Sequence, residues 1–249
     1  MWLEAALWGW VSGSALLLGA GLGYFPRLPQ RWIATIMAFG SGVLMAALSF
    51  DLLEEAYDDG GGLSTSMGFL GGALLYTIPN YYLAQWGAEA RKKSDDQQPS
   101  EQSQPGSGSA LAMGALLDGI PESIVIGLSL LHGHHVSKVA VIAIFLSNVP
   151  EGLSSAAGMR RAGRRVRYTF GVWGGIAFTL GLAAVVGNVL FSSASPMIIA
   201  ATLALGAGAI LAMVVTTMIP EAFEHTQHFS GLIAVAGFLL AFLLSKLGM

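Results

Sequence analysis

Two apolar segments of the sequence carry acidic residues at spacings that suit a cation site. Asp118 and Glu122 stand four residues apart in LLDGIPESIVIG. Ser147 and Glu151 stand four apart in FLSNVPEGLSSA, with Asn148 beside Ser147. Residues four apart share one face of a helix, so each segment would present oxygen ligands on one side. Ionisable groups inside membrane-spanning helices are costly and are therefore candidates for function.

A proline precedes the glutamate in each of these segments. Because proline has no backbone N–H, Pro121 frees the carbonyl of Leu117 in a helix. Pro150 frees the carbonyl of Leu146 in the same way, so both segments gain oxygen acceptors for a cation. No Lys or Arg in a predicted span is placed to neutralise the three carboxylates. We therefore expect these carboxylates to be protonated, bound to cations or hydrated in a cavity.

The composition indicates that membrane-spanning helices hold these segments. Of the 249 residues, 54% are hydrophobic and 11% are charged, against about 25% charged residues in ordinary soluble domains. The chain has no cysteine, which excludes disulfides and thiolate metal sites. We predict an all-α membrane protein whose residues 1–249 form a single transmembrane domain of eight helices. The predicted spans are about 5–25, 32–54, 66–88, 109–131, 137–159, 168–191, 196–219 and 230–248.

The basic residues predict the orientation of these helices. Ten of the twelve Lys and Arg residues lie in the loops after the first, third, fifth and seventh spans. Because basic loops are biased to the cytoplasm, we expect both termini to lie outside it. The long loop at about 89–108 is polar and rich in Pro, Gly and Ser. It is predicted to be a disordered cytoplasmic linker with no core of its own.

An internal similarity links the second and seventh spans. GSGVLMAALSFDLLEEAYDD at 40–59 aligns without a gap with GAGAILAMVVTTMIPEAFEH at 206–225. Since the second and seventh spans would run in opposite directions, the alignment predicts an inverted repeat. The first three and the last three spans would form its halves, with the fourth and fifth between them. A chance similarity of two helices rich in small residues is the alternative.

The two acidic segments resemble the paired HNxPEG-type motifs of the ZIP (Zrt/Irt-like) family of divalent metal transporters. The second span ends in FDLLEEA and the seventh in MIPEAFEH, which are also similar to the family's versions. The resemblance extends over the whole chain. It implies a 3+2+3 fold and a metal site between the fourth and fifth helices. It also implies that cations of the zinc, iron and manganese class move into the cytoplasm.

The resemblance also implies which residues bind the metal. Glu122 and Glu151 occupy the glutamate positions of the two motifs. Asp118 stands where the family has His, whereas Ser147 and Asn148 stand where the second motif has His or Gln and a polar residue. The site has then lost its imidazole. Oxygen donors favour Mn, Fe, Mg or Ca more than a His-containing set would, and carboxylates also bind Zn.

Further candidate ligands stand at both predicted mouths of the transport path. The outer ones are Glu55, close to Glu54, Asp58 and Asp59, and His132, His134 and His135 between the fourth and fifth spans. The inner ones, after the seventh span, are Glu221, Glu224, His225 and His228. The inner four are spaced to lie on one helical face, and we favour metal contact for them. A solvated turn is the alternative for the outer histidines.

Other classes of function have less support. The sequence has no HExxH, GxSxG or P-loop motif, so we expect neither an enzyme nor an ATP-driven pump. The main alternative is a proton- or cation-coupled carrier of a small solute in which Asp118, Glu122 and Glu151 titrate; a selective channel is another. We expect no prosthetic group, with Zn, Mn, Fe, Cd or a similar divalent ion as the transported substrate. We expect the protein to lie in the lipid bilayer of a bacterial inner membrane and to bind no nucleic acid. A homodimer is left open.

Overall fold

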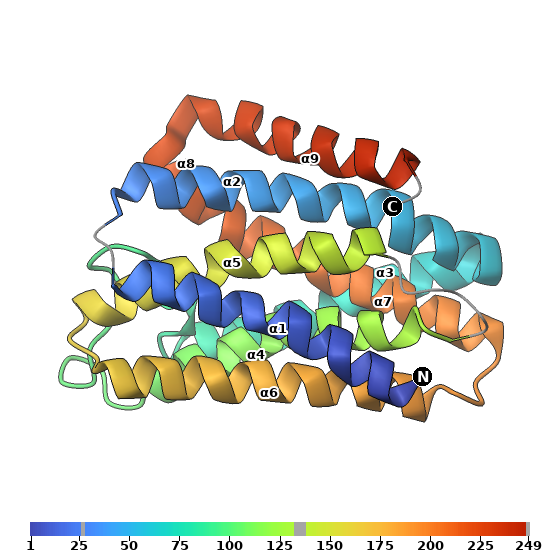
Figure 1. Cartoon of the computed structure of the whole chain (residues 1–249), viewed down its shortest axis with the longest axis horizontal. Coiled ribbons are helices and arrows are strands. Elements are labelled where there is room, and N and C mark those ends of the chain that lie inside the picture. The colour runs from blue at the N-terminus through green and yellow to red at the C-terminus, as the bar shows by residue number, and fades with distance from the viewer. Residues whose placement is uncertain (26–27, 132–137, 248–249) are drawn as a thin grey trace.

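The computed structural model describes residues 1–25, 28–131 and 138–247, and all regular secondary structure in these ranges is helical. The helices form an elongated bundle (Figure 1). The α-helices are α1 (Trp2–Tyr24), α2 (Gln30–Ala47), α3 (Leu53–Ala84), α4 (Ser107–Leu128), α5 (Lys138–Arg161), α6 (Val166–Leu190), α7 (Pro196–Met213), α8 (Ile219–Thr226) and α9 (Ser230–Lys246). The π-helical turns are η1 (Leu48–Leu52) and η3 (Val214–Met218), and the 3-10 helices are η2 (Ala88–Lys92) and η4 (Gln227–Phe229).

Six helical stretches of the described chain are long and apolar enough to cross a membrane. Two of them, Gln30–Ala84 with 55 residues and Pro196–Lys246 with 51, are much longer than the roughly 20 residues of one crossing. The first breaks at Gly61, whose φ of 71° is unfavourable for other residue types. Every predicted span overlaps a helix, and the count of eight crossings stays a prediction.

Small residues set the spacing between the helices. Gly19 of α1 lies so close to the backbone of α5 that a Cβ atom would not fit, and Gly72 of α3 lies equally close to α7. Large apolar side chains such as those of Leu74 and Phe178 face outward instead. Close backbone approach at glycines and an apolar exterior are typical of helix packing in membranes.

The acidic motifs lie on α4 and α5, which other helices enclose. α1 packs against α5 and α6, while α4 packs against α6 and α7. α2 packs between α5 and α9, and α3 packs along α7. The start of α1 and the end of α9 lie at one end of the bundle, and the segment between α3 and α4 lies at the other (Figure 1).

The two π-helical turns occupy matching positions in the internal similarity. The gap-free alignment of 40–59 with 206–225 places η1 on η3 residue for residue. Single π-helical turns within α-helices are rare and are frequent at functional sites. The two aligned segments therefore share a local backbone feature as well as a sequence pattern. The inverted repeat of three helices on each side stays a prediction.

The segment between α3 and α4 is folded, whereas the sequence predicts disorder at about 89–108. Arg91, Lys92, Ser94 and Gln98 of this segment are buried. The Nε2 of Gln98 donates a hydrogen bond of 3.1 Å to the Ser155 carbonyl of α5. A prediction from composition considers the segment alone and therefore indicates disorder. It does not include the polar groups of other helices that bind this segment.

The end of the same segment caps α4. The Glu101 carboxylate accepts hydrogen bonds of 2.8 Å from the backbone N–H groups of Gly106 and Gly108. Arg164 also donates to it at 3.2 Å. These hydrogen bonds lower the pKa of Glu101, because they favour its ionised form. A negative charge at this position also suits the N-terminal end of a helix.

Candidate metal centre

The acidic side chains of α4 and α5 lie in one buried region, which we call the central cluster: Asp118, Glu122 and Glu151. They are 2%, 1% and 5% exposed, respectively. Pro121 and Pro150 lie within the two helices, directly before the glutamates. Glu122 lies one helical turn after Asp118 on α4, and a single ammonium group contacts both Asp118 and Glu151. The structure thus brings the acids of both sequence motifs together.

Asp118 is held by residues of α3 and η2. Arg91 donates two hydrogen bonds of 2.8 Å, from Nε to Oδ2 and from Nη2 to Oδ1. The hydroxyl of Tyr76 donates to Oδ1 at 2.9 Å and accepts from Arg91 Nη2 at 2.7 Å. Burial alone would lower the pKa of Arg91, but the charge and hydrogen bonds of Asp118 raise it. Both oxygens of Asp118 are therefore occupied by a bidentate partner that stays charged.

Lys92 brings a second cation to the central cluster. Its Nζ lies 2.8 Å from Oε1 of Glu151 and 3.2 Å from Oδ2 of Asp118. The Lys92 carbonyl accepts a hydrogen bond from the hydroxyl of Ser154, which holds the backbone against α5. The sequence places no cation near these carboxylates, because Arg91 and Lys92 fall in the loop that it predicts to be disordered. The structure supplies both cations from η2.

Glu122 differs from the other two acids because it has no ion-pair partner among the described residues, whereas Oε1 of Glu151, which also lacks a hydrogen-bond donor, lies 2.8 Å from Nζ of Lys92. Oε1 of Glu122 is fully buried and has no hydrogen-bond donor among the described residues. A buried carboxylate oxygen without a donor is costly and calls for an explanation. With every group ionised, three carboxylates face the two cations Arg91 and Lys92, which leaves one negative charge. The cluster therefore offers both a ligand atom and an unbalanced charge to a further cation.

The polar residues before Glu151 have local partners. The Ser147 hydroxyl donates to the Ile144 carbonyl at 2.9 Å, and the lone pairs of the hydroxyl oxygen can still bind a cation. The amide of Asn148 donates to the carbonyl and the hydroxyl of Ser12, each at 3.1 Å. Asn148 thus ties α5 to α1. These bonds use only the N–H groups of the amide, so Oδ1 of Asn148 and Oγ of Ser147 could both still bind a cation, and both residues stay candidate ligands.

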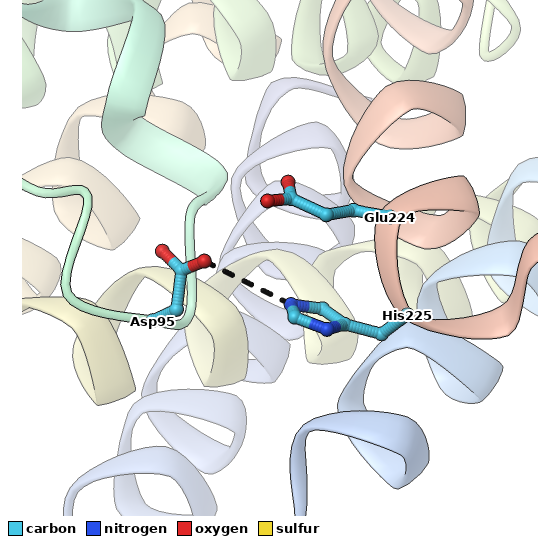
Figure 2. A group of neighbouring side chains, drawn as sticks. All are labelled: Asp95, Glu224 and His225. Atoms are coloured by element: carbon cyan, nitrogen blue, oxygen red, sulfur yellow. Dashed lines mark ion pairs between the residues drawn. The ribbon is translucent and has the colours of Figure 1, made fainter.

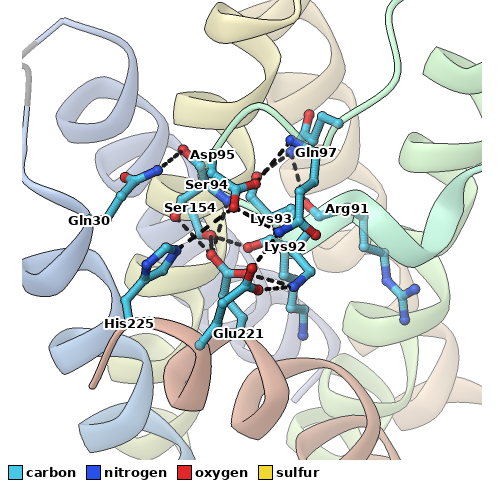
Figure 3. Close-up of polar contacts among 12 residues, drawn as sticks. Gln30, Arg91, Lys92, Lys93, Ser94, Asp95, Gln97, Ser154, Glu221 and His225 are labelled. Carbon is cyan, nitrogen blue, oxygen red and sulfur yellow. Dashed lines mark hydrogen bonds and ion pairs between the residues drawn. The ribbon is translucent and has the colours of Figure 1, made fainter. Parts of the chain in front are cut away.

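A second polar region forms where the segment after η2 meets α8 (Figure 3). Glu221 accepts hydrogen bonds of 3.0 and 2.8 Å from the backbone N–H and the hydroxyl of Ser94. Lys93 pairs with Glu224 and lies 3.5 Å from Glu221. Partial burial alone would lower the pKa of Lys93, but the hydrogen bond to Glu224 and the nearby acids raise it. Glu221, a predicted inner ligand, therefore holds the segment through Oε1, and a metal contact of its other oxygen stays a prediction.

Three side chains of this region could hold a metal ion, and we call them the inner cluster: Asp95, Glu224 and His225. One ligand atom from each lies within 4.8 Å of the other two. Nε2 of His225 lies 3.9 Å from Oδ2 of Asp95, and Figure 2 shows the three side chains converging. An imidazole with two carboxylates suits Zn²⁺. The inner cluster joins two predicted ligands to Asp95, which the sequence did not indicate.

His228 does not share this face, contrary to the prediction from its spacing. α8 ends at Thr226, and Gln227 has a positive φ of 45°, which breaks the helix. His228 follows in η4 and is exposed. The spacing rule fails here because it assumes that one helix continues through residue 228.

The predicted outer ligands receive less support. Glu55 is half-buried on α3, and the neighbouring acids are exposed, namely Glu54, Asp58 and Asp59. His132, His134 and His135 lie outside the described residues. An outer metal contact therefore stays a prediction.

The sequence interpretation missed Asp95 of the inner cluster and three residues that bind the central cluster, namely Tyr76, Arg91 and Lys92. A signal existed for the two cations: three buried carboxylates require compensation, and the basic run RKK begins three residues after the third predicted span ends. Tyr76 and Asp95 carry no comparable signal, because a tyrosine in a span and an acid in a loop are both common.

Comparison with known proteins yields a distant relative. The chain is 27% identical over 226 residues to a protein of Arabidopsis thaliana named "Putative zinc transporter". The matched region covers 89% of this chain and 35% of the relative, so the chain spans about a third of that protein's length. A scan against models of protein families finds no match.

Proposed function

We propose that this chain is a ZIP-like membrane transporter that moves divalent transition-metal cations into the cytoplasm through the central cluster. The observation that carries the proposal is Glu122, whose buried Oε1 lacks a donor among the described residues, in a cluster where acids outnumber cations. The name of the distant relative supports metal transport, and the long apolar helices support a membrane protein.

The proposed metal ligands come from α4 and α5. They are the carboxylates of Glu122 and Glu151, the hydroxyl of Ser147, the amide oxygen of Asn148 and the carbonyls that Pro121 and Pro150 leave unpaired. Asp118, the remaining predicted ligand, holds Arg91 with both oxygens. Oxygen donors of this kind suit Mn²⁺ and Fe²⁺, and they also accept Zn²⁺. Two helices then share the cation, as expected for a site that must open toward each side in turn.

The inner cluster is the proposed station between the central cluster and the cytoplasm. Asp95, Glu224 and His225 lie where the segment after η2 meets α8. α8 lies at the end of the bundle opposite the start of α1 and the end of α9 (Figure 1). A weak site at this place would accept the cation after it leaves Glu122 and Glu151. Because the sequence has no ATP-binding motif, the gradient of the metal or of a coupled ion would drive transport.

A proton- or cation-coupled carrier of a small solute is the second candidate. It is favoured by the same buried carboxylates, since Glu122 and Glu151 could exchange protons during a cycle. The two proposals differ in their need for metal. A carrier of this kind would move its solute in a buffer that contains a chelator, whereas the proposed metal transporter would show no flux there.

Uptake of Zn²⁺ or Mn²⁺ into liposomes that contain the purified protein and a metal-sensitive dye tests the proposed function. We expect saturable uptake that Glu122→Gln reduces by roughly tenfold or more, because the amide removes a charged ligand. Asp96→Asn is the matched control: it also removes one carboxylate, but from a side chain that is 89% exposed. Equal uptake by Glu122→Gln and the unmodified chain would contradict the proposal.

A further inference from the structure

We propose that Lys92 occupies the transport site as a tethered counter-cation, and that a divalent cation must displace its ammonium group in order to bind. The inference rests on the proposed function and deepens it. It names a residue that decides which cations the central cluster accepts.

The position of the Lys92 ammonium is the first argument. It contacts Asp118 of α4 at 3.2 Å and Glu151 of α5 at 2.8 Å, so it bridges the two helices that carry the motifs. Glu122, the acid without an ion-pair partner among the described residues, lies one helical turn after Asp118 on α4. A cation shared by α4 and α5 would use the same carboxylate of Glu151. The ammonium and the metal therefore compete for one place.

The difference between the two neighbouring cations is the second argument. Arg91 is fixed by two hydrogen bonds to Asp118, by one to Tyr76 and by one to the Ala88 carbonyl. The planar guanidinium suits such a bidentate site, whereas lysine is a point charge on a flexible stem. Lys92 can therefore leave Glu151 while Arg91 continues to hold η2 in place.

The charge of the central cluster is the third argument. With every group ionised, its three carboxylates and the cations Arg91 and Lys92 leave one negative charge. A monovalent ion that replaced the Lys92 ammonium would leave the charge unchanged, whereas a divalent ion would bring the cluster to neutrality. A divalent ion that bound beside the ammonium would meet a like charge at short range in surroundings of low dielectric constant.

The attachment of Lys92 to the bundle strengthens this selection. Its backbone carbonyl accepts the hydrogen bond from Ser154, and the adjacent Arg91 is anchored to Asp118. The ammonium therefore stays within reach of Glu151 after it is displaced, and a tethered group competes at a high effective concentration. Sodium or potassium would have to displace a tethered cation of equal charge. A divalent metal has an electrostatic advantage over that cation, so Lys92 favours divalent cargo.

Amine labelling of the full-length protein in detergent, read by mass spectrometry, tests displacement directly. Without metal, Lys92 is 4% exposed and should be labelled slowly. Saturating Zn²⁺ or Mn²⁺ should raise its labelling several-fold, because the ammonium leaves the carboxylates. Lys246, which is exposed on α9, is the internal reference and should not change. An unchanged labelling rate of Lys92 in saturating metal would overturn the proposal.

Binding of the same ions to Lys92→Met provides a second test. Removal of the competing ammonium should lower the dissociation constant for Zn²⁺ or Mn²⁺ by about tenfold or more. Lys246→Met makes the same chemical change far from the central cluster and should bind as the unmodified chain does. Equal or weaker binding by a folded Lys92→Met would overturn the proposal. If Lys92→Met does not fold, the labelling experiment on the unmodified protein decides the question instead.

The two experiments separate this inference from the proposed function. If the unmodified chain and Lys92→Met both fail to bind Zn²⁺ and Mn²⁺ saturably, the proposed function is wrong, and the role of Lys92 is wrong with it. If the unmodified chain binds metal while the labelling of Lys92 stays constant, only the role of Lys92 is wrong.

Discussion

Residue 118 connects the central cluster to the segment between α3 and α4, which carries Arg91. The motif that the acidic segment of α4 resembles has a histidine at this position, whereas Asp118 has two oxygens that accept hydrogen bonds from Arg91. A neutral imidazole has one acceptor nitrogen and could not receive both bonds. The aspartate at 118 and the arginine at 91 are therefore a matched pair.

Asp118→Asn tests this pairing through stability. The substitution leaves the buried guanidinium of Arg91 without a carboxylate, which should cost about 3–5 kcal/mol and lower the Tm in detergent. Glu122→Gln should lower the Tm much less, since Oε1 of Glu122 has no donor to lose among the described residues. The double variant Asp118→Asn, Arg91→Gln should recover part of the loss. A Tm of Asp118→Asn equal to that of Glu122→Gln would contradict the pairing.

Glu101 should make the stability of the α4 cap depend on pH. Because the pKa of Glu101 is lowered, its ionised form stabilises the folded state at pH values above 4.5, the ordinary pKa of a glutamate. This contribution is lost as the pH falls through the lower folded-state pKa. The Tm difference between the unmodified chain and Glu101→Gln should therefore be present at neutral pH and close in acid. A difference that persisted unchanged in acid would mean that the cap does not depend on this charge.

At the scale of elements, the segment that joins α3 to α4 is held by partners from several helices. Glu221 of α8 accepts two hydrogen bonds from Ser94, and Ser155 of α5 accepts one from Gln98. The segment itself is polar and would not fold alone. Its order therefore depends on acids and carbonyls that the bundle presents, which explains why its own composition predicts disorder.

The break between α8 and η4 separates two histidines that the sequence groups together. We expect His225→Ala to lower the rate of metal uptake several-fold while the affinity of the central cluster stays constant, because a peripheral station mainly affects release. His228→Ala is the matched control and should transport normally, since His228 lies beyond the break at Gln227. Measurement of uptake against metal concentration checks both variants. Loss of high-affinity binding in His225→Ala would place His225 in the primary site instead.

At the scale of the whole molecule, the positions of the chain ends fit an even number of crossings. α1 begins and α9 ends at one end of the bundle, opposite the segment between α3 and α4 (Figure 1). The side of the membrane that each end faces is a prediction from the basic loops, as is the bacterial inner membrane.

Single cysteines can test this orientation cleanly, because the chain contains no other cysteine. Ser103 lies in the segment before α4 and Ser193 lies between α6 and α7, and both are exposed. We expect a thiol reagent that cannot cross the membrane to label Ser193→Cys in intact cells, and to label Ser103→Cys only after the membrane is opened. Labelling of both in intact cells, or the reverse pattern, would show that the predicted topology is wrong.

The helices and the acidic motifs could be predicted from the sequence because both depend on local patterns. Long apolar runs indicate helices in a membrane, and a spacing of four places Asp118 and Glu122 on one face. The partners of these acids could not be predicted in the same way. Arg91 and Lys92 reach the central cluster only because the chain between α3 and α4 folds back onto the bundle, which is a tertiary property.

Anomalous diffraction from crystals grown with Mn²⁺ or Zn²⁺ would test the central claim most directly, because it locates the metal without reference to transport rates. The account predicts an anomalous peak between Glu122 and Glu151, at about 2.0–2.6 Å from their carboxylate oxygens. It also predicts that the Lys92 ammonium no longer contacts Glu151. A peak confined to the inner cluster, with the Lys92 ion pairs intact and no metal at Glu122, would contradict it.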